Sequence, residues 1–401
     1  MVSVIYTYIP PHVRRAKFIF RLFFITALGL VLVCALVMKH TSIGDLTEEE
    51  KCPACYGTNL CPAIKSGSIH LYPFISWFNA KNVYFGHTSA GQKLTFKKLG
   101  HDWELEELDA YVCRLVGQNS KNNCRLSELA WRLDDVHTAI FNTVLSNLSL
   151  RSGISFCPVA DTKQIDDLVD RVVKHSKETA YKTLLINVLT MFILNPEPVI
   201  LQAFRAEDGW PFPKYLGSCG RVTAQEFIGS TLAYYTNSEW RTRAKLALQL
   251  LKIAQRMTFH DPRFSLYMTD VTPENLAVDS HGNLKVVDLG NIIIVDKNPP
   301  LSVRPEGWKE KHTSDILEEC ETCFSYSQED ICGHRTSDHN YYAVCQFFEH
   351  TAWLRYAPEN VLRAYPQLPE LLRECAEPQR EQGRYIAVRK LIAVLANVTL
   401  G

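Results

Sequence analysis

Three polar residues in the second half of the chain have types and spacing that could hold metal ions on a polyphosphate. Asp270 and Asn275 lie in TDVTPENLAV, and Asp288 ends an apolar, strand-like run. Carboxylate and carboxamide oxygens are the ligands that hard divalent cations prefer. Asp and Asn are also common turn residues, so two ordinary hairpins are the alternative interpretation. The joint spacing favours the metal–phosphate interpretation, which requires other elements to position these side chains.

The segments around these residues predict a small β-rich part and a larger helical part. Apolar runs on both sides of GHTSAGQ predict a β-hairpin over 82–99, and 212–229 predicts two short strands. Apolar residues at helical spacing predict helices over 102–116, 126–148, 162–178, 181–194, 239–257, 340–354, 360–375 and 383–398. Strands and helices are mixed at first and helices dominate later, which is the order of an α+β protein.

The composition is that of a globular protein with enough apolar residues for a large core. The chain has 401 residues, of which 46% are hydrophobic and 21% are charged. Its 43 basic and 43 acidic residues balance, and no block of Lys and Arg supplies the field that a nucleic acid requires. We therefore expect no nucleic-acid partner.

The N-terminal segment differs from the rest of the chain. Basic residues between Arg14 and Arg21 precede an uncharged apolar run of 17 residues at 22–38. A spanning helix has about 17–25 residues, whereas the apolar core of a signal peptide has about 7–15. The run therefore predicts the signal anchor of a single-pass type II membrane protein, with residues 1–21 in the cytoplasm. A signal peptide cleaved near Cys34–Ala35 is the alternative.

Cysteine usage favours a lumenal location for the remainder of the chain. Apart from Cys34, twelve cysteines could form up to six disulfides in an oxidising compartment. These candidates are Cys52, Cys55, Cys61, Cys113, Cys124, Cys157, Cys219, Cys320, Cys323, Cys332, Cys345 and Cys375. The Cys-x-x-Cys pairs Cys52/Cys55 and Cys320/Cys323 leave zinc as an alternative, although neither has the paired spacing of a zinc ribbon.

Two further features fit a lumenal chain. Residues 39–70 predict a Cys-rich stalk, in which closely spaced cysteines indicate a stapled knot rather than packed core. Asn147 and Asn397 lie in glycosylation sequons, which have meaning only if the chain enters the secretory pathway.

The order of the predicted elements resembles that of a protein kinase. Asp270 and Asn275 match the D-x-x-x-x-N spacing of the catalytic loop, and Asp288-Leu289-Gly290 resembles the metal-binding Asp-Phe-Gly turn. Five separated segments are more specific: KCPACYGTNLC, KNVYF, NPEPVILQAF, DGWPFPKYLGSCGR and DHNYYAVCQ. Together they resemble the divergent protein kinase family of the secretory pathway that includes the "deleted in autism" proteins. The resemblance runs from about Lys51 to the C-terminus.

The resemblance implies a bilobal, protein-kinase-like fold behind the N-terminal helix. Residues 71–229 would form the small sheet lobe with a helical insertion, and residues 230–401 would form the larger helical lobe. The same resemblance implies residence in the Golgi or endoplasmic reticulum lumen and, for some members, secretion.

The resemblance also implies roles for the matching residues in phosphoryl transfer from ATP with Mg²⁺ or Mn²⁺. Asp270 would accept the proton of an acceptor hydroxyl, and Asn275 and Asp288 would hold the metal. Lys97, in LTFKK, would pair the α- and β-phosphates. Its neighbour Lys98 is the alternative if the strand register differs by one residue.

Further residues have supporting roles in this interpretation. Glu104, at the start of the following predicted helix, would steer Lys97, although a solvated acidic face is an equally good interpretation of ELEE. Glu226 lies in QEFIG, which resembles the hinge between the lobes. Asp338 resembles the buried aspartate that braces the catalytic loop, and Arg384 resembles the arginine of the terminal helices.

Several expected kinase features are missing. Ser76, Phe78 and Lys81 occupy the positions of the phosphate-covering glycines, and side chains there keep backbone amides away from phosphates. Met268-Thr269 replaces the His-Arg pair before the catalytic aspartate. Thr272 stands where many kinases carry a lysine that neutralises the transferring phosphate.

Three functions therefore compete. The first is an atypical lumenal kinase that phosphorylates a hydroxyl of a secretory-pathway protein. The second is a pseudokinase, a disulfide-stapled module or secreted ligand that binds a cell-surface receptor without catalysis. The third is a redox or structural protein built on the Cys-x-x-Cys pairs, which Cys61, close to Cys52 and Cys55, makes the weakest of the three.

Overall fold

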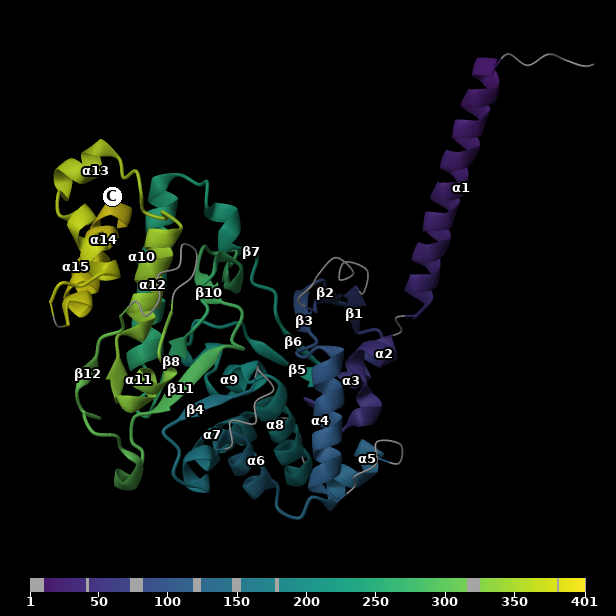
Figure 1. Cartoon of the computed structure of the whole chain (residues 1–401), viewed down its shortest axis with the longest axis horizontal. Helices are drawn as coiled ribbons and strands as arrows, with labels where there is room; N and C mark the ends of the chain where they lie inside the picture. The colour runs from purple at the N-terminus through teal and green to yellow at the C-terminus, as the bar shows by residue number, and fades with distance from the viewer. Residues whose placement is uncertain are drawn as a thin grey trace, which may run out of the picture.

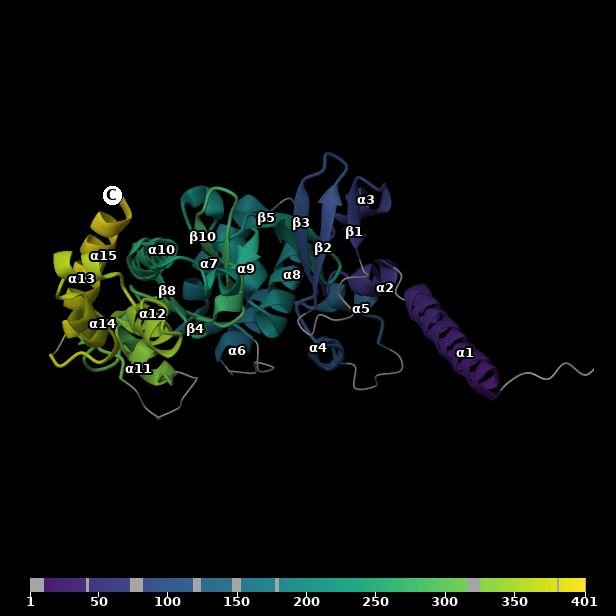
Figure 2. The ribbon, with the colours of Figure 1, turned by 90° about the horizontal axis from the view of Figure 1, so that it is seen from above.

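The protein has a small sheet lobe and a larger helical lobe, with a helical block between them (Figure 1). The computed structural model describes residues 11–40, 43–72, 82–117, 124–145, 153–176, 180–315, 325–380 and 382–400. Seen from above, the body is elongated, with α13–α15 at one end and β1–β3 towards the other (Figure 2). This mixed architecture agrees with the α+β, kinase-like fold that the sequence predicts.

Helices and strands are mixed before residue 300, and helices predominate after it. The helices are α1 Pro11–His40, α2 Ile43–Thr47, α3 Cys61–Lys65, α4 Asp102–Leu115, α5 Leu126–Leu129, α6 Val136–Leu145, α7 Thr162–His175, α8 Tyr181–Leu194, α9 Glu197–Ala203, α10 Trp240–Phe259, α11 Gln328–Gly333, α12 His339–His350, α13 Glu359–Ala364, α14 Leu368–Ala376 and α15 Gly383–Leu400. The strands are β1 Ile69–Tyr72, β2 Val83–Thr88, β3 Lys93–Lys97, β4 Ser155–Cys157, β5 Tyr215–Cys219, β6 Val222–Glu226, β7 Ser230–Thr231, β8 Phe264–Met268, β9 Leu276–Val278, β10 Leu284–Val286, β11 Ile292–Asp296, β12 Lys311–His312 and β13 Thr336–Ser337.

The small lobe is built on a five-stranded antiparallel sheet with the order β1-β2-β3-β6-β5. In β3, Leu94 and Phe96 are buried in the apolar face of this sheet. Because side chains alternate along a strand, Lys97 is directed to the opposite face. Gly86 permits the close approach of β1, since a Cβ there would lie 2.2 Å from the His70 carbonyl oxygen. The expected hairpin over 82–99 is therefore present.

The large lobe is organised around α10, whose apolar residues fill its core. Leu250, Leu251, Ala254 and Met257 recur at helical spacing and are at most 1% exposed. Burying a leucine of this kind stabilises the fold by about 1.5–3 kcal/mol. Helices α12 and α15 pack against α10 and complete the lobe.

The helical block (102–203) joins the two lobes rather than belonging to the small lobe alone. Its strand β4 pairs in parallel with β11, in a three-stranded sheet of order β4-β11-β8. The Cys157–Cys332 disulfide fixes the same connection. The predicted unit 71–229 therefore shares a sheet with the large lobe.

Helix boundaries differ from the prediction where the chain turns within an apolar pattern. The segment predicted as one helix over 126–148 is divided into α5, a short 3-10 turn and α6. The segment predicted over 360–375 is divided into α13 and α14, because Pro366 cannot continue the first helix.

The N-terminal segment forms one long helix, α1, which projects away from the body (Figures 1 and 2). Among the described residues, no helix combines the length and apolar character needed to cross a membrane.

Ten of the predicted cysteines form disulfides in the described residues. The pairs are Cys52–Cys55, Cys61–Cys219, Cys113–Cys124, Cys157–Cys332 and Cys345–Cys375. Pairing of Cys52 with Cys55 removes the zinc alternative there, because both sulfurs are consumed by the bond. Cys320 and Cys323 lie outside the described residues.

The two predicted glycosylation positions differ in what the structure describes. Asn397 is exposed on the last helix, α15, and Asn147 lies outside the described residues.

Candidate active site

Lys97 ends β3 inside the interface between the lobes. Its Nζ atom lies 2.7 Å from Glu197 Oε1 and donates a hydrogen bond of 2.6 Å to the Val287 carbonyl. Only 9% of the Lys97 side chain is exposed, so this ammonium group is held in one place. Lys98 also lines the cavity described below, but its ammonium group pairs with Glu48 at 2.7 Å. Lys97, not Lys98, therefore forms the buried ion pair with Glu197.

The partner of Lys97 is Glu197, which the sequence interpretation missed. Glu197 is the first residue of α9, and the Asn195 side chain accepts a hydrogen bond from its backbone N–H at 2.9 Å. Its carboxylate also accepts a hydrogen bond from the Leu289 N–H at 3.2 Å. The expected partner was Glu104. That carboxylate lines the same cavity as Lys97, but it accepts the His101 N–H at 2.7 Å, which caps α4.

A signal for Glu197 was present in the sequence. NPEPVILQAF is one of the segments that carries the resemblance, and its glutamate begins a helix after a proline. The resemblance predicts the carboxylate that meets Lys97 on the next helix along the chain. The helical block moves the true partner 100 residues away.

Asp270 and Asp288 meet at the same cavity as Lys97 and Glu197. The cavity has a volume of about 380 Å³, and Asn195 and Gly290 are also among the residues that line it. Asp270 follows β8 and is exposed, whereas Asp288 is partly buried. Asp288 Oδ1 accepts a hydrogen bond of 3.2 Å from the Gly290 N–H, which fixes the carboxylate in its turn.

Asn275 supports the loop that carries Asp270. It ends a short 3-10 turn, Pro273–Asn275, and is 3% exposed. Its side-chain amide donates a hydrogen bond of 3.4 Å to the Asp270 carbonyl. Its own carbonyl accepts a hydrogen bond of 2.9 Å from the Val287 N–H, one residue before Asp288. The two acidic loops are thereby tied together.

The site holds more negative than positive charge. Burial raises the pKa of the Glu197 carboxyl group, the Lys97 ammonium group opposes this shift, and the nearby Asp288 carboxylate adds to it. Four carboxylates and two ammonium groups line the cavity: Glu104, Glu197, Asp270 and Asp288, with Lys97 and Lys98. Hard carboxylate oxygens and excess negative charge fit a divalent cation such as Mg²⁺ or Mn²⁺.

The strand before Asp270 is braced from α12, but not by the residue expected. His339 Nε2 lies 2.9 Å from the Met268 carbonyl, and Asn340 Oδ1 accepts the Met268 N–H at 2.9 Å. The expected brace was Asp338, which forms a different contact. Its carboxylate accepts the Ser314 N–H at 2.8 Å and pairs with Arg384 at 2.6 Å. Asp338 precedes α12, and His339 and Asn340 lie in its first turn. Because successive side chains point in different directions there, these residues contact different partners.

Glu226 lies at the end of β6, where the small sheet continues into the large lobe. Its carboxylate lies 3.0 Å from the Lys285 ammonium group and accepts the Lys214 N–H at 3.2 Å. Glu226 therefore connects the two lobes. Contact of its carboxylate with a nucleotide stays a prediction.

Comparisons with known proteins agree with this geometry. Residues 189–378 match the family described as the protein-kinase domain of FAM69. The chain is 32% identical to human divergent protein kinase domain 2A, with 98% of each chain covered. It is 31% identical to the Xenopus tropicalis protein of that name, over 92% of this chain and 94% of the relative. It is 24% identical to mouse divergent protein kinase domain 2B, over 62% and 60% of the two chains.

Proposed function

Because this chain belongs to the divergent protein kinase family, we propose that its cleft binds ATP with Mg²⁺ or Mn²⁺ and transfers phosphate to a hydroxyl group. The observation that carries the proposal is the buried Lys97–Glu197 ion pair, formed at 2.7 Å beside Asp270 and Asp288. Phosphoryl transfer requires mainly positioning and charge neutralisation, and these side chains could supply both.

Each residue has a distinct part in this proposal. Glu197 fixes the Lys97 ammonium group, which would pair with phosphate oxygens. Asp288 and the side chain of Asn275 would hold the metal, which neutralises phosphate charge when bound. The exposed carboxylate of Asp270 would orient an acceptor hydroxyl and take its proton.

The disulfides are typical of proteins in a secretory or extracellular compartment, which supports such a location. We accordingly propose that the acceptor is a protein of the secretory pathway. The proposal includes retention in the Golgi or endoplasmic reticulum through the N-terminal segment. It also includes secretion as the alternative fate. A glycan on the exposed Asn397 would support them.

One observation favours a second candidate function, a binding module without catalysis. Thr272 lies where an active kinase commonly has a lysine, so the loop brings no positive charge of its own to the transferring phosphate. In this case the fold would serve as a disulfide-stapled ligand for a receptor. Nucleotide binding alone would not separate the two candidates, but phosphate transfer would.

The test is thermal unfolding of the disulfide-bonded chain with millimolar ATP and Mn²⁺ or Mg²⁺. We expect nucleotide and metal together to raise Tm in the wild type and not in Asp288→Ala. Asp134→Ala is the matched control, because Asp134 is an exposed aspartate that is not among the residues lining the cavity. An unchanged Tm in the wild type, or an equal rise in Asp288→Ala, would contradict nucleotide binding in this cleft.

A further inference from the structure

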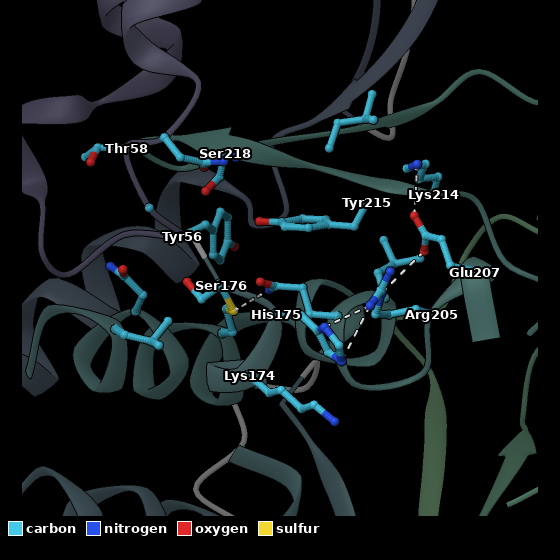
Figure 3. Close-up of a pocket in the computed structure, with 18 residues that line it drawn as sticks. Tyr56, Thr58, Lys174, His175, Ser176, Arg205, Glu207, Lys214, Tyr215 and Ser218 are labelled. Carbon is cyan, nitrogen blue, oxygen red and sulfur yellow. Dashed lines mark hydrogen bonds and ion pairs between the residues drawn. The ribbon is translucent and has the colours of Figure 1, made fainter. Parts of the chain in front are cut away.

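A second cavity shares no lining residue with the proposed active site, although residues of α8 and α9 line both. Its volume is about 530 Å³, which is within the range of small-molecule sites. It is framed by the segment after the Cys52–Cys55 disulfide, the end of α7, helices α8 and α9, and strand β5 (Figure 3). Leu201 and Gln202 of α9 line it, about one turn after Glu197.

One side of this cavity is positively charged. Among the described residues, Lys174, Arg205 and Lys214 line it, together with one acidic residue, Glu207. Glu207 lies 3.4 Å from Arg205 Nε and 3.0 Å from the Lys214 ammonium group, so one carboxylate is shared by two cations. The cations are therefore in excess. In Figure 3, Arg205 and Lys214 lie on the same side as Glu207, and Lys174 lies below His175.

His175 positions the arginine at this side. Its Nδ1 atom lies 2.8 Å from Arg205 Nη1, and Glu207 contacts the Nε side of the same guanidinium. The guanidinium is thereby held between two side chains. A fixed, planar guanidinium is well suited to binding the oxygens of a phosphate or sulfate group.

The opposite side offers hydroxyl and amide groups. Tyr215 and Ser218 of β5 face the cavity in Figure 3, and Ser218 is 1% exposed. Burial raises the pKa of Tyr215 to about 12, so its hydroxyl stays protonated at neutral pH. Asn187 lines the cavity as well, and its amide nitrogen donates to the Pro53 and Cys55 carbonyls at 2.8 and 3.0 Å. These bonds orient the side chain and set the position of its carbonyl oxygen.

A solvated cluster of surface charges is the simpler explanation for three cations. Such a cluster does not require a cavity, buried polar groups on the facing wall, or an asparagine oriented by two backbone carbonyls. Those features together are typical of a ligand site, in which a few fixed polar groups set the orientation of the ligand.

We propose that this cavity binds a small phosphate or sulfate ester with a hydroxylated body, such as a sugar phosphate or sugar sulfate. The anionic group would lie against Arg205 and Lys214, and the hydroxyl groups of the body would face Tyr215, Ser218 and Asn187. The proposal does not depend on catalysis in the other cleft.

Thermal unfolding of the full chain tests this with glucose 6-phosphate and glucose 6-sulfate, each at about 10 mM. We expect at least one ester to raise Tm by about 2–4 °C, and glucose at the same concentration to have no effect. The ester that gives the larger rise in Tm shows whether the cavity prefers a phosphate or a sulfate group. No rise with either ester would overturn the proposal.

Two variants and a control place the binding in this cavity. Arg205→Gln and Lys214→Gln should each abolish or halve the rise in Tm with the ester. The Lys214 side chain is 54% exposed, so its replacement leaves the fold intact. Lys390→Gln, at an exposed lysine of α15, should keep the full rise. Equal rises in all three variants would place the ester elsewhere and overturn the proposal.

Asp288→Ala separates this proposal from the one for the active site. It should lose the response to ATP and metal while it keeps the response to the ester. Loss of both responses in a folded Asp288→Ala protein would mean that the ester binds in the active-site cleft.

Discussion

The carboxylate of Glu197 holds the Lys97 ammonium group at 2.7 Å, although the two residues are 100 positions apart in the sequence. Both side chains are at most 9% exposed, so each would be an unpaired buried charge without the other. Removing one member of such a pair commonly costs about 3–5 kcal/mol.

Lys97→Met should therefore destabilise the protein, and more so at high pH. Burial already raises the pKa of Glu197 in the folded state, and loss of the lysine removes a cation that lowers it. For a carboxyl group with a raised folded pKa, the favourable contribution is complete below the unfolded pKa and is lost as pH rises through the folded pKa. Urea unfolding should show a larger loss for Lys97→Met at pH 8 than at pH 5.

The double variant Lys97→Met/Glu197→Gln is the control for that prediction. Without a carboxylate at 197, the extra loss between pH 5 and pH 8 should disappear. If the double variant keeps the same pH dependence as Lys97→Met, Glu197 is not the group that titrates.

Asp270→Asn should abolish phosphate transfer and leave nucleotide binding unchanged. Asp270 is exposed, so its replacement should change the free energy of unfolding by less than about 0.5 kcal/mol. Asparagine keeps the size of the side chain but cannot accept the proton of an acceptor hydroxyl. Transfer of labelled phosphate and the Tm rise with ATP and Mn²⁺ should be measured on the same preparation. Transfer at the wild-type rate would exclude Asp270 as the base.

The stability of the wild type should fall when the pH drops below about 6.5. Burial lowers the pKa of His339 to about 3, while its Nε2 atom contacts the Met268 carbonyl at 2.9 Å. A lowered folded pKa gives a contribution that is complete above the unfolded pKa and is lost as pH falls towards the folded value. Between pH 6.5 and pH 5 this loss is about 2 kcal/mol.

Urea unfolding of the wild type and of His339→Gln at those two pH values checks this assignment. The glutamine variant should be less stable at pH 6.5 but should lose less stability on going to pH 5. An identical pH dependence in the two proteins would show that other groups cause it.

Arg384→Met should destabilise the large lobe by about 3–5 kcal/mol. The Arg384 guanidinium pairs with Asp338 at 2.6 Å and donates to the Cys375 carbonyl at 2.9 Å, and its side chain is 1% exposed. Removing it leaves a buried carboxylate and a carbonyl without these donors. The matched control is Arg380→Met, because Arg380 is exposed and its change should cost less than about 0.5 kcal/mol. Similar midpoints of urea unfolding for the two variants would contradict the prediction.

Local patterns predicted the elements of this fold well where periodicity was strong. The interval 181–194 was predicted as a helix and is α8 with the same bounds, because its apolar residues continue up to Asn195-Pro196. The hairpin of β2 and β3 follows from alternation and a turn rich in Gly and Ser. The pairing of β4 with β11 could not be predicted in this way, because three residues carry too little pattern to choose a distant partner.

The candidate site was predictable only in part, because spacing along the chain identifies some of its residues and not others. Spacing along the chain brought Asp270 and Asp288 into one hypothesis, and the structure places both at one cavity with Lys97. Glu197 and the bracing residues His339 and Asn340 depend on how separate elements pack. Nothing in their immediate sequence shows which backbone groups they will meet.

The Cys61–Cys219 and Cys157–Cys332 bonds determine what a single proteolytic cut does to this protein. The two closed loops overlap in sequence, so together they enclose every peptide bond from Cys61 to Cys332. A protease that cuts once anywhere in that interval leaves two fragments still tied by at least one bridge. The nicked molecule would run as a single band on a gel until a reductant is added, and its halves would not diffuse apart.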